Sequence, residues 1–538
     1  MNALAGTRRM VRLALRRDRF VLTFWVLSLT VFLATTTHMS VTGLPTPRDV
    51  VTETQFMAAN PGMRLMSLSA GASVGAYAMS RSYLTLAILA AVMSALAVVR
   101  HTRQSEERGR DEFLRAGVVG PSASLAAAVT VALGANLVLA PLLSLAMIAN
   151  GQPVAGSFAA GAAIAAVGVA FTGVAAVASQ LSSTARGANG LAMAALAVAF
   201  VVSGVGNMLG GVDKSGVVAF SAWPTWLSPI GWGFEMRPFG GDRWWLLALS
   251  GAFAAVLVAA AGSYAARRDL GRGVLPVQTG RAQASRGLLR PIGLAWRLQR
   301  STFLAWLVGL LGFGLIFGSV TDSVTTAEGS MREWYLKMGG TSDMLDAFIT
   351  SFVEMAGMMV AIYAVQVLLR MREEEVRGRL EPVLAGAVTR PRWVMGYIVT
   401  VALGAVVLLV AFAAGLALTA GLVMGDTTGL LRDVTGAALA QLPAVLVVAA
   451  AVVAVFALLP RRATTVSWLL LAAFVLLSPV FGLSLGLPQW VLDLSPFAYQ
   501  KAPAQAIGVV SIGVLLAIAV ALVAAGLATF RRRDLVTG

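Results

Sequence analysis

The stretch Glu-Glu-Arg-Gly-Arg-Asp-Glu-Phe-Leu-Arg-Ala-Gly at residues 106–117 returns in altered form as Glu-Val-Arg-Gly-Arg-Leu-Glu-Pro-Val-Leu-Ala-Gly at residues 375–386. The two copies lie 269 positions apart in a chain of 538 residues, which is half its length. Each copy is a charged segment between two long apolar runs, so each is expected at a membrane surface. The pattern predicts an internal duplication with one such segment in each half.

The composition is typical of a helical membrane protein. Hydrophobic residues make up 58% of the chain and charged residues 12%, and the mean hydropathy is +0.80, which predicts an all-α integral membrane protein. The net charge of +16 comes from basic residues at the ends of apolar runs, where they orient helices, so it does not indicate nucleic-acid binding. Cysteine is absent, which excludes disulfides and thiolate chemistry.

Apolar runs of about twenty residues, the length needed to cross a bilayer, recur along the whole chain. Twelve are expected, at 20–37, 82–100, 122–149, 154–180, 188–210, 243–265, 302–320, 351–369, 393–424, 435–459, 465–486 and 506–529. They predict twelve transmembrane helices in two six-helix repeats, at 1–275 and 276–538. The boundary falls in the stretch 271–292, where Gly, Pro, Gln, Ser and Arg replace the apolar runs, as in a linker.

The basic residues also predict the orientation. With the N-terminus in the cytoplasm, the segments expected inside hold 31 of the 41 basic residues, while all three lysines fall outside. The positive-inside rule selects this orientation. Arginine greatly outnumbers lysine in an Ala-, Val- and Gly-rich chain, which suggests a GC-rich bacterial genome. We therefore expect a multi-pass protein of the bacterial cell membrane with both termini in the cytoplasm.

Further paired motifs support the duplication. Leu-Ser-Pro at 227–229 matches Leu-Ser-Pro at 494–496, and Arg-Arg-Asp-Leu at 267–270 matches the same four residues at 532–535. Because six spans return the chain to the side where it began, the two repeats are expected to have the same topology. They would be related by an axis along the membrane normal, as parallel repeats.

The charged repeats resemble the coupling helix of type-2 ABC exporter permeases, whose common form is close to E-x-x-x-G-T-[LD]-E-x-L-L-A. The fused arrangement of two six-span halves, with the Leu-Ser-Pro and terminal Arg-Arg-Asp-Leu motifs, is similar to the tetronasin-type polyketide-antibiotic exporter permeases of actinobacteria. The resemblance covers nearly the whole chain. This sequence departs from the pattern at Arg110 and Arg379, where many relatives carry Thr.

The resemblance implies an ABC-2 type transmembrane domain that binds two copies of a separate ATPase, which would hold ATP and Mg²⁺. It implies multidrug efflux, the export of lipophilic or amphipathic compounds, and hence antibiotic resistance. Basic amphipathic elbow helices would lie at 8–19 and 294–300. The residues expected to couple to the ATPase are Glu106, Glu107, Arg108, Gly109, Arg110, Asp111, Glu112, Glu375, Arg377, Gly378, Arg379 and Glu381.

No catalytic site or metal site is expected in this chain. A P-loop requires a lysine that follows a glycine, and none of Lys214, Lys337 and Lys501 does. The only two histidines, His38 and His101, are expected on opposite sides of a bilayer, so they cannot share a metal ion or serve one site. ATP hydrolysis is therefore assigned to the partner subunit, and this chain is expected to carry no cofactor.

The main alternative is a proton-coupled secondary drug transporter, because parallel repeats occur there too. Glu354 is its candidate proton or cation site, with Gln366 on the same expected span. A lipid-modifying membrane enzyme would need His, Asp or Glu clustered at an interface, and the sequence has no such cluster.

A substrate path follows only from the family architecture, in which the second, fifth, eighth and eleventh spans would line it. Soft apolar side chains suit lipophilic compounds, although core or lipid packing explains most of these residues equally well. The candidates are Met193, Phe200, Met208, Phe352, Glu354, Met358, Met359, Tyr363 and Phe474.

Overall fold

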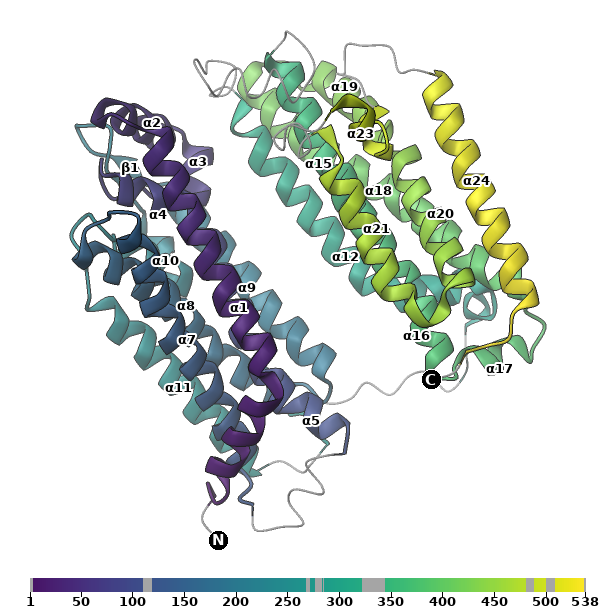
Figure 1. Ribbon diagram of the computed structural model, residues 1–538, viewed down its shortest axis with the longest axis horizontal. Helices are drawn as coiled ribbons and strands as arrows, with labels where there is room; N and C mark the ends of the chain where they lie inside the picture. Colours follow the sequence, from purple (N-terminus) through teal and green to yellow (C-terminus); the bar gives the residue numbers. More distant parts are fainter. Residues whose placement is uncertain are drawn as a thin grey trace. The chain divides into compact units, whose positions relative to one another are not determined.

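The computed structural model describes residues 3–109, 119–267, 271–275, 283, 285–321, 344–479, 488–499 and 509–536. It divides into two compact units, Met1–Gly280 and Arg281–Gly538, whereas the boundary expected from the sequence lies at 275/276. Both units are bundles of long helices (Figure 1). Each is described by itself.

The described part of the first unit contains six long helices. They are α1 (Thr7–Gly43), α4 (Val74–His101), α7 (Ala123–Ala149), α8 (Val154–Leu181), α9 (Ala185–Met208) and α11 (Leu246–Arg267). The shorter elements are α2 (Pro47–Ala59), α3 (Pro61–Met66), α5 (Arg103–Glu107), the 3₁₀ helix η1 (Trp223–Leu227) and α10 (Pro229–Glu235). A small antiparallel hairpin of β1 (Gly211–Val212) and β2 (Ala219–Phe220) pairs Gly211 with Phe220.

The described part of the second unit also contains six long helices. Its long helices are α12 (Pro291–Gly318), α15 (Met344–Leu368), α18 (Arg390–Met424), α20 (Leu442–Leu458), α21 (Ala463–Leu476) and α24 (Val509–Arg532). The shorter ones are η2 (Arg286–Leu289), α16 (Arg370–Val376), α17 (Leu380–Leu384), α19 (Thr427–Leu439), η3 (Pro460–Arg462), α23 (Gln489–Leu492) and η4 (Pro496–Tyr499).

Side chains at the helix starts explain where several helices begin. The Ser73 hydroxyl accepts the Ala76 N–H at the start of α4, and Thr184 accepts the Gly187 N–H at the start of α9. Such caps satisfy amides that have no partner inside the helix. Proline occupies the first turn of α12, α18 and α20, where its missing N–H costs nothing.

Eleven helices in the described ranges are long and apolar enough to cross a membrane. Eleven of the expected apolar runs lie largely on these helices. The run at 465–486 is helical as α21 only over Ala463–Leu476, and residues 480–487 lie outside the described ranges, so a twelfth span is not shown. The protein is therefore a multi-pass, all-α membrane protein.

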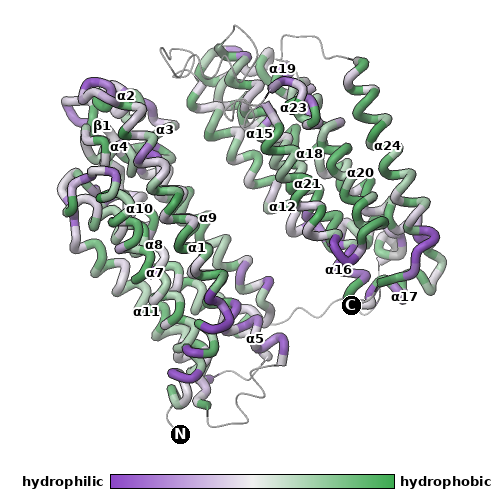
Figure 2. Tube along the Cα trace, viewed as in Figure 1, coloured by the Kyte–Doolittle hydropathy of each residue, from purple (hydrophilic) through white to green (hydrophobic). Residues whose placement is uncertain are grey.

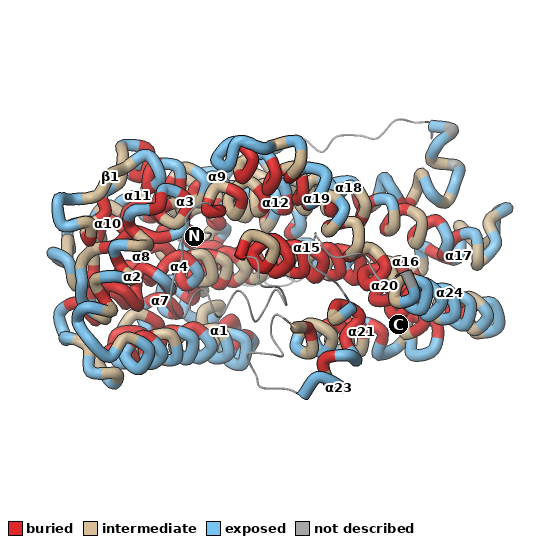
Figure 3. Tube along the Cα trace, turned by 90° about the horizontal axis from the view of Figure 1, so that it is seen from above, coloured by how far each residue is buried: buried red, intermediate tan, exposed pale blue. Residues whose placement is uncertain are grey.

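In each unit, central helices are surrounded by peripheral ones. In the first, 72% of the residues in the apolar 18-residue stretch of α4 are buried, and the same share is buried in α8. The corresponding share is 22% in α1 and in α11. In the second, 72% is buried in α15 but only 17% in α24, and Figure 3 shows α15 mostly buried and α24 largely exposed. The peripheral helices present apolar side chains outward, as lipid contact requires.

We call the end of each unit where α1 or α12 begins and α4 or α15 finishes the basal end. Figure 2 shows hydrophilic segments there, at α5 and the start of α1 and at α16 and α17. The expected elbow helices at 8–19 and 294–300 are not separate, because α1 and α12 run unbroken through them. No proline or glycine interrupts either junction, so helix geometry simply continues.

Candidate functional site

The charged segment of the first unit is fastened by a buried arginine. Arg103 in α5 is fully buried, and its Nε donates to the Ser179 carbonyl of α8 at 2.8 Å. Its Nη1 donates to the Glu106 carboxylate at 2.9 Å and to the Arg272 carbonyl at 3.2 Å. This one guanidinium therefore connects α5 to α8 and to the chain beyond α11.

Glu106 completes the connection. Its Oε1 accepts the backbone N–H of Gly271, which follows α11, at 2.6 Å. The side chain is 6% exposed, so the carboxylate depends on these partners rather than on water. We call Arg103, Glu106 and Gly271 the first clamp.

The second unit has a corresponding set of bonds. Glu375 is 1% exposed and accepts the Val536 N–H at 3.0 Å, just beyond α24. Arg372 donates to Glu375 at 3.1 Å and to the Val536 carbonyl at 2.6 Å. Arg533 adds two further bonds to the Glu375 carboxylate, at 2.6 and 3.0 Å. We call Arg372, Glu375, Arg533 and Val536 the second clamp.

The two clamps occupy matching positions. Arg103 and Arg372 are 269 residues apart, as are Glu106 and Glu375, and both pairs have the spacing Arg-x-x-Glu. In each unit the glutamate binds the backbone of the segment that follows the last long helix. Charge-assisted bonds of this kind are among the stronger protein hydrogen bonds.

The glycine of each Arg-Gly-Arg triplet has a conformational role. Gly109 and Gly378 have φ angles of 68° and 67°, in the left-handed region. Their N–H groups donate to the carbonyls of Glu106 and Glu375 at 3.0 and 3.1 Å. Because a side chain is strained at this φ, glycine favours the left-handed turn that ends each helix.

Among the described residues of the charged segments, Glu107, Arg108, Arg377 and Arg379 are exposed. Glu107 accepts the Ala185 N–H at the start of α9 at 3.0 Å. Arg377 and Arg379 pair with Glu373 and Glu374, and both guanidinium side chains are more than half exposed, at 54% and 53%. These charges are available for contact with another molecule.

A groove of about 650 Å³ lies beside α17 at this surface. It is lined by Glu381, Leu384, Ala385, Gly386, Ala387, Val388, Thr389, Arg390 and Leu535. The groove joins the second charged segment to the start of α18 and the end of the chain.

The predicted coupling residues thus have different surroundings. The carboxylates of Glu106 and Glu375 are held within their own units, and Glu107 accepts the Ala185 N–H. Gly109 and Gly378 form the left-handed turns. The exposed ones include Arg108, Arg377, Arg379 and Glu381. The prediction at Arg110, Asp111 and Glu112 lies outside the described residues. In the described ranges, no group of three His, Cys, Asp or Glu side chains is placed to hold a metal ion.

The Leu-Ser-Pro motifs also match in detail. Ser228 donates to the Ala199 carbonyl of α9 at 2.7 Å, and Ser495 donates to the Phe474 carbonyl of α21 at 2.8 Å. Each hydroxyl accepts the N–H two residues ahead, at 3.2 and 3.3 Å. Both motifs therefore bind the loop to the preceding long helix.

The predicted path residues are dispersed over helices of the two units. Met193, Phe200 and Met208 lie on α9, with Met208 36% exposed. On α15, Phe352, Glu354, Met358 and Tyr363 are at most 8% exposed, and Met359 is partly buried. Phe474 lies on α21 and is half-buried.

Several of the α15 side chains have identified packing partners. The Phe352 and Phe317 ring centroids are 4.1 Å apart, and those of Phe352 and Phe348 are 4.7 Å apart. The Ser478 hydroxyl lies 3.8 Å from the Met358 sulfur. Packing within the second unit accounts for these side chains.

Sequence reasoning missed one polar cluster at the basal end of the first unit. Asp18 of α1 is 2% exposed and binds Arg100 at 3.1 Å and His101 at 2.8 Å, both at the end of α4. The sequence does contain an indication of this cluster, because Asp18 is the only acidic residue in 1–19, a stretch with six arginines.

Comparison with known proteins gives the same family for the second half and for the whole chain. Residues 288–531 match the family described as Multidrug efflux system permease Rv1217c, C-terminal domain. The chain is 39% identical over 541 residues to the Multidrug efflux system permease protein Rv1217c of Mycobacterium tuberculosis (strain ATCC 25618 / H37Rv). The alignment covers 99% of this chain and 96% of that protein. The chain therefore belongs to the Rv1217c family of multidrug efflux system permeases.

Proposed function

We propose that this chain is the membrane subunit of an ATP-driven exporter of the ABC-2 type, which moves lipophilic or amphipathic drugs out of the cytoplasm or the inner leaflet. The observation that carries the proposal is the pair of matching clamps. Each one joins the short helix that follows a central helix, α5 after α4 or α16 after α15, to the chain that follows the last long helix of its unit.

The clamps provide a route for force. In the second unit, α16 follows α15 directly, and Glu375 binds the chain beyond α24 through three hydrogen bonds. A push on α16 would therefore reach the central helix α15 and the peripheral helix α24 together. A packed interior transmits such displacements rather than absorbing them.

Two copies of a separate ATPase would dock on the two charged segments, and those copies would bind ATP and Mg²⁺. In the second segment, Arg377, Arg379 and Glu381 and the adjoining groove form the contact surface. Exposed charges of this kind set the orientation and rate of docking more than its affinity.

The proposal includes an internal duplication with two parallel six-helix repeats and twelve spans. It is supported by the paired clamps, the paired left-handed glycines and the paired Leu-Ser-Pro contacts. With the ATPase in the cytoplasm, the basal ends and both termini lie on that side of the bacterial cell membrane. Drug efflux in this arrangement would confer antibiotic resistance.

The test is reconstitution with candidate ATPase subunits from the same host. We expect a complex of one chain with two ATPases, whose ATP hydrolysis in nanodiscs responds to lipophilic antibiotics. Reversing Arg377 and Arg379 to Glu should abolish this response, whereas reversing Arg432, which is exposed on α19, should not. Drug transport that persists without any ATPase, or that is equally sensitive to Arg432→Glu, would contradict the proposal.

A second candidate function, proton-coupled drug transport, is favoured by one observation. Glu354 is 3% exposed and lies ten residues after the start of α15, about 15 Å along the helix. A buried acid at this depth is costly and is commonly functional in membrane proteins. Transport driven by a proton gradient without ATP, and lost in Glu354→Gln, would replace the ATP-driven proposal.

A further inference from the structure

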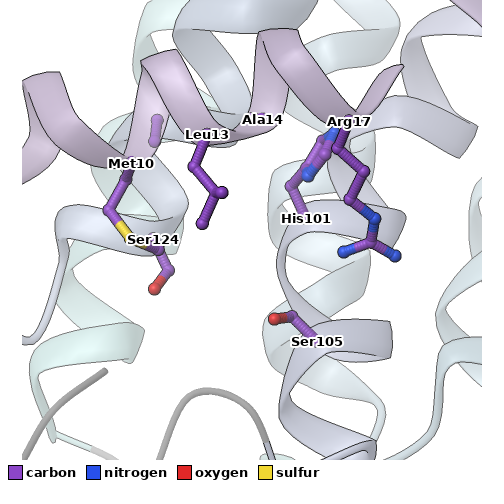
Figure 4. Close-up of a pocket in the computed structure, with 8 residues that line it drawn as sticks. Met10, Leu13, Ala14, Arg17, His101, Ser105 and Ser124 are labelled. Atoms are coloured by element: carbon purple, nitrogen blue, oxygen red, sulfur yellow. The ribbon is translucent and has the colours of Figure 1, made fainter. Parts of the chain in front are cut away.

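The central helix α4 is fastened differently at its two ends. At the basal end His101 binds Asp18 of α1 at 2.8 Å, and it also lines a pocket of about 270 Å³ that is seen beside α1 in Figure 4. At the opposite end, which we call the outer end, α4 begins against the loop 237–242 between α10 and α11. The backbone of this loop is strained.

Three residues of the loop have a backbone conformation that L-amino acids rarely adopt. The φ angles are 49° at Arg237, 66° at Phe239 and 40° at Asp242. No other non-glycine residue in the part of the chain that the structure describes has a positive φ. Arg237 also precedes Pro238, and a residue before proline normally has a φ of about −120°. Each such residue lowers the population of this backbone about 5- to 30-fold relative to a relaxed one.

The strained backbone places the Phe239 ring against the starts of two central helices. A Cβ atom at Gly75, in the first turn of α4, would lie 2.8 Å from the ring. A Cβ atom at Gly156, in the first turn of α8, would lie 2.2 Å from it. A side chain at either position would displace the ring, so Phe239 joins α4 to α8 through two glycines.

The base of the loop is firmly held. Glu235 at the end of α10 is 2% exposed, and its carboxylate accepts hydrogen bonds from Arg237 at 3.2 Å and Arg243 at 2.8 Å. The Ser221 hydroxyl donates to the same carboxylate at 2.6 Å. A change in the φ angles of the loop would therefore move mainly its tip, which carries Phe239.

Two contributions to the stability of the tip oppose each other. The Phe239 N–H donates to Asp242 Oδ1 at 2.9 Å, and the ring packs against the hydrophobic core of the first unit. Burial of the ring stabilises this conformation, whereas the positive φ angles destabilise it. The two effects have similar magnitudes, which is what an element with two accessible states requires.

We propose that the loop 237–242 is a latch that opens and closes during drug transport. In the closed state, which the structure shows, Phe239 holds the outer ends of α4 and α8 together. In the open state the ring leaves Gly75 and Gly156, the φ angles relax and the two helix ends separate. The latch depends only on the chain being a drug-efflux permease and not on an ATPase partner.

Arg237 allows the strain to be removed with a matched control. Arg237→Ala and Arg237→Gly both lose the bond to Glu235, but only glycine adopts a φ of 49° without strain. We expect Arg237→Gly to melt at a higher temperature than Arg237→Ala. Because a more stable closed state opens less often, Arg237→Gly should also export a lipophilic dye about fivefold more slowly from cells of the same host.

The opening can be measured directly, since the chain contains no cysteine. Spin labels on cysteines introduced at Ala72 and Val154, two exposed residues beside the starts of α4 and α8, report the distance between the helix ends. In membrane vesicles of the host frozen during dye export, we expect a closed and an open population. The open population should be about fivefold smaller in Arg237→Gly than in Arg237→Ala.

Higher stability together with slower export and a smaller open population supports the latch. Equal melting temperatures of the two Arg237 variants would show that the loop is not strained, and equal export rates would show that the strain has no part in transport. Either result, or a single distance population during export, would overturn the proposal.

Gly216→Ala is the control for a change in stability alone, because it adds a side chain at a φ of 73° in the turn of the β1–β2 hairpin. It should lower the melting temperature and change dye export less than about twofold. A change in export as large as that between the two Arg237 variants would also overturn the latch, because general stability would then control transport.

Discussion

Replacing Glu375 with Ala should destabilise the second unit far more than any surface change nearby. The carboxylate is 1% exposed and accepts four hydrogen bonds, from Arg372, from both terminal nitrogens of Arg533 and from the Val536 N–H. Removing it leaves two guanidinium groups, with side chains only 11–12% exposed, without their counter-charge. The loss of one partner from a buried ion pair costs about 3–5 kcal/mol.

A matched control is Glu374→Ala. Glu374 is the next residue in the sequence and pairs with Arg379, whose side chain is 53% exposed, so its removal should cost about 0–1 kcal/mol. For a unit of 258 residues, each kcal/mol lowers the melting temperature by about 2–4 °C. We therefore expect a decrease of about 6–20 °C for Glu375→Ala and at most about 4 °C for Glu374→Ala.

The measurement is thermal unfolding of the full chain in nanodiscs, followed by intrinsic tryptophan fluorescence. The double variant Glu375→Ala with Arg533→Ala should be less destabilised than the sum of the two single variants, because it removes both charges of one pair. If the melting temperatures of Glu375→Ala and Glu374→Ala agree within experimental error, the hydrogen bonds of the Glu375 carboxylate contribute little to stability. The proposal that the second clamp transmits force would then be wrong.

Three further changes have defined outcomes. Gly378→Ala places a side chain at a φ of 67° and should cost about 1–2 kcal/mol, seen as a lower melting temperature and faster amide exchange in α16, whereas unchanged exchange would exclude the strained turn. Ser228→Ala and Ser495→Ala each remove a hydroxyl that accepts an N–H and donates to the preceding helix. Each should lower the free energy of unfolding by about 1 kcal/mol in the same melting assay, and a large decrease in only one variant would contradict equivalent roles. Gly233→Ala would place a methyl group 1.9 Å from the Tyr83 hydroxyl and should cost about 1–3 kcal/mol through overpacking, measured by the same melting assay; an unchanged melting temperature would contradict the close packing.

The positions of the membrane spans could be predicted from the sequence because a bilayer imposes one demand on every span: about twenty apolar residues in a helix that satisfies its own backbone. The exact ends could not be predicted. The expected elbow helix at 8–19 and the expected span at 20–37 are one continuous helix, α1, over Thr7–Gly43, because the basic residues before the apolar run have good helix propensity and no breaker separates them from it.

The clamps illustrate a second limit. The repeated Arg-Gly-Arg motif identified the right segments, and its glycines proved to be left-handed. However, the groups that fasten Glu106 and Glu375 include the backbone N–H groups of Gly271 and Val536, and a backbone donor leaves no signature in the residue type. Asp18 and His101 are 83 residues apart, and only the packing of α1 on α4 brings them together.

Both clamps close on their own half of the chain. The Glu106 carboxylate accepts a hydrogen bond from the Gly271 N–H, and the Glu375 carboxylate accepts one from the Val536 N–H. Each bond joins residues of one half, so neither depends on the peptide link between the halves near residue 280. A gene cut at that connection should yield two polypeptides that each complete their own fold. Co-expression of 1–280 and 281–538 as separate chains is expected to give two proteins that insert into the membrane independently and can be purified from it. Fusion of the two halves in one gene would then ensure that they are made in equal amounts, but it would not be required for folding.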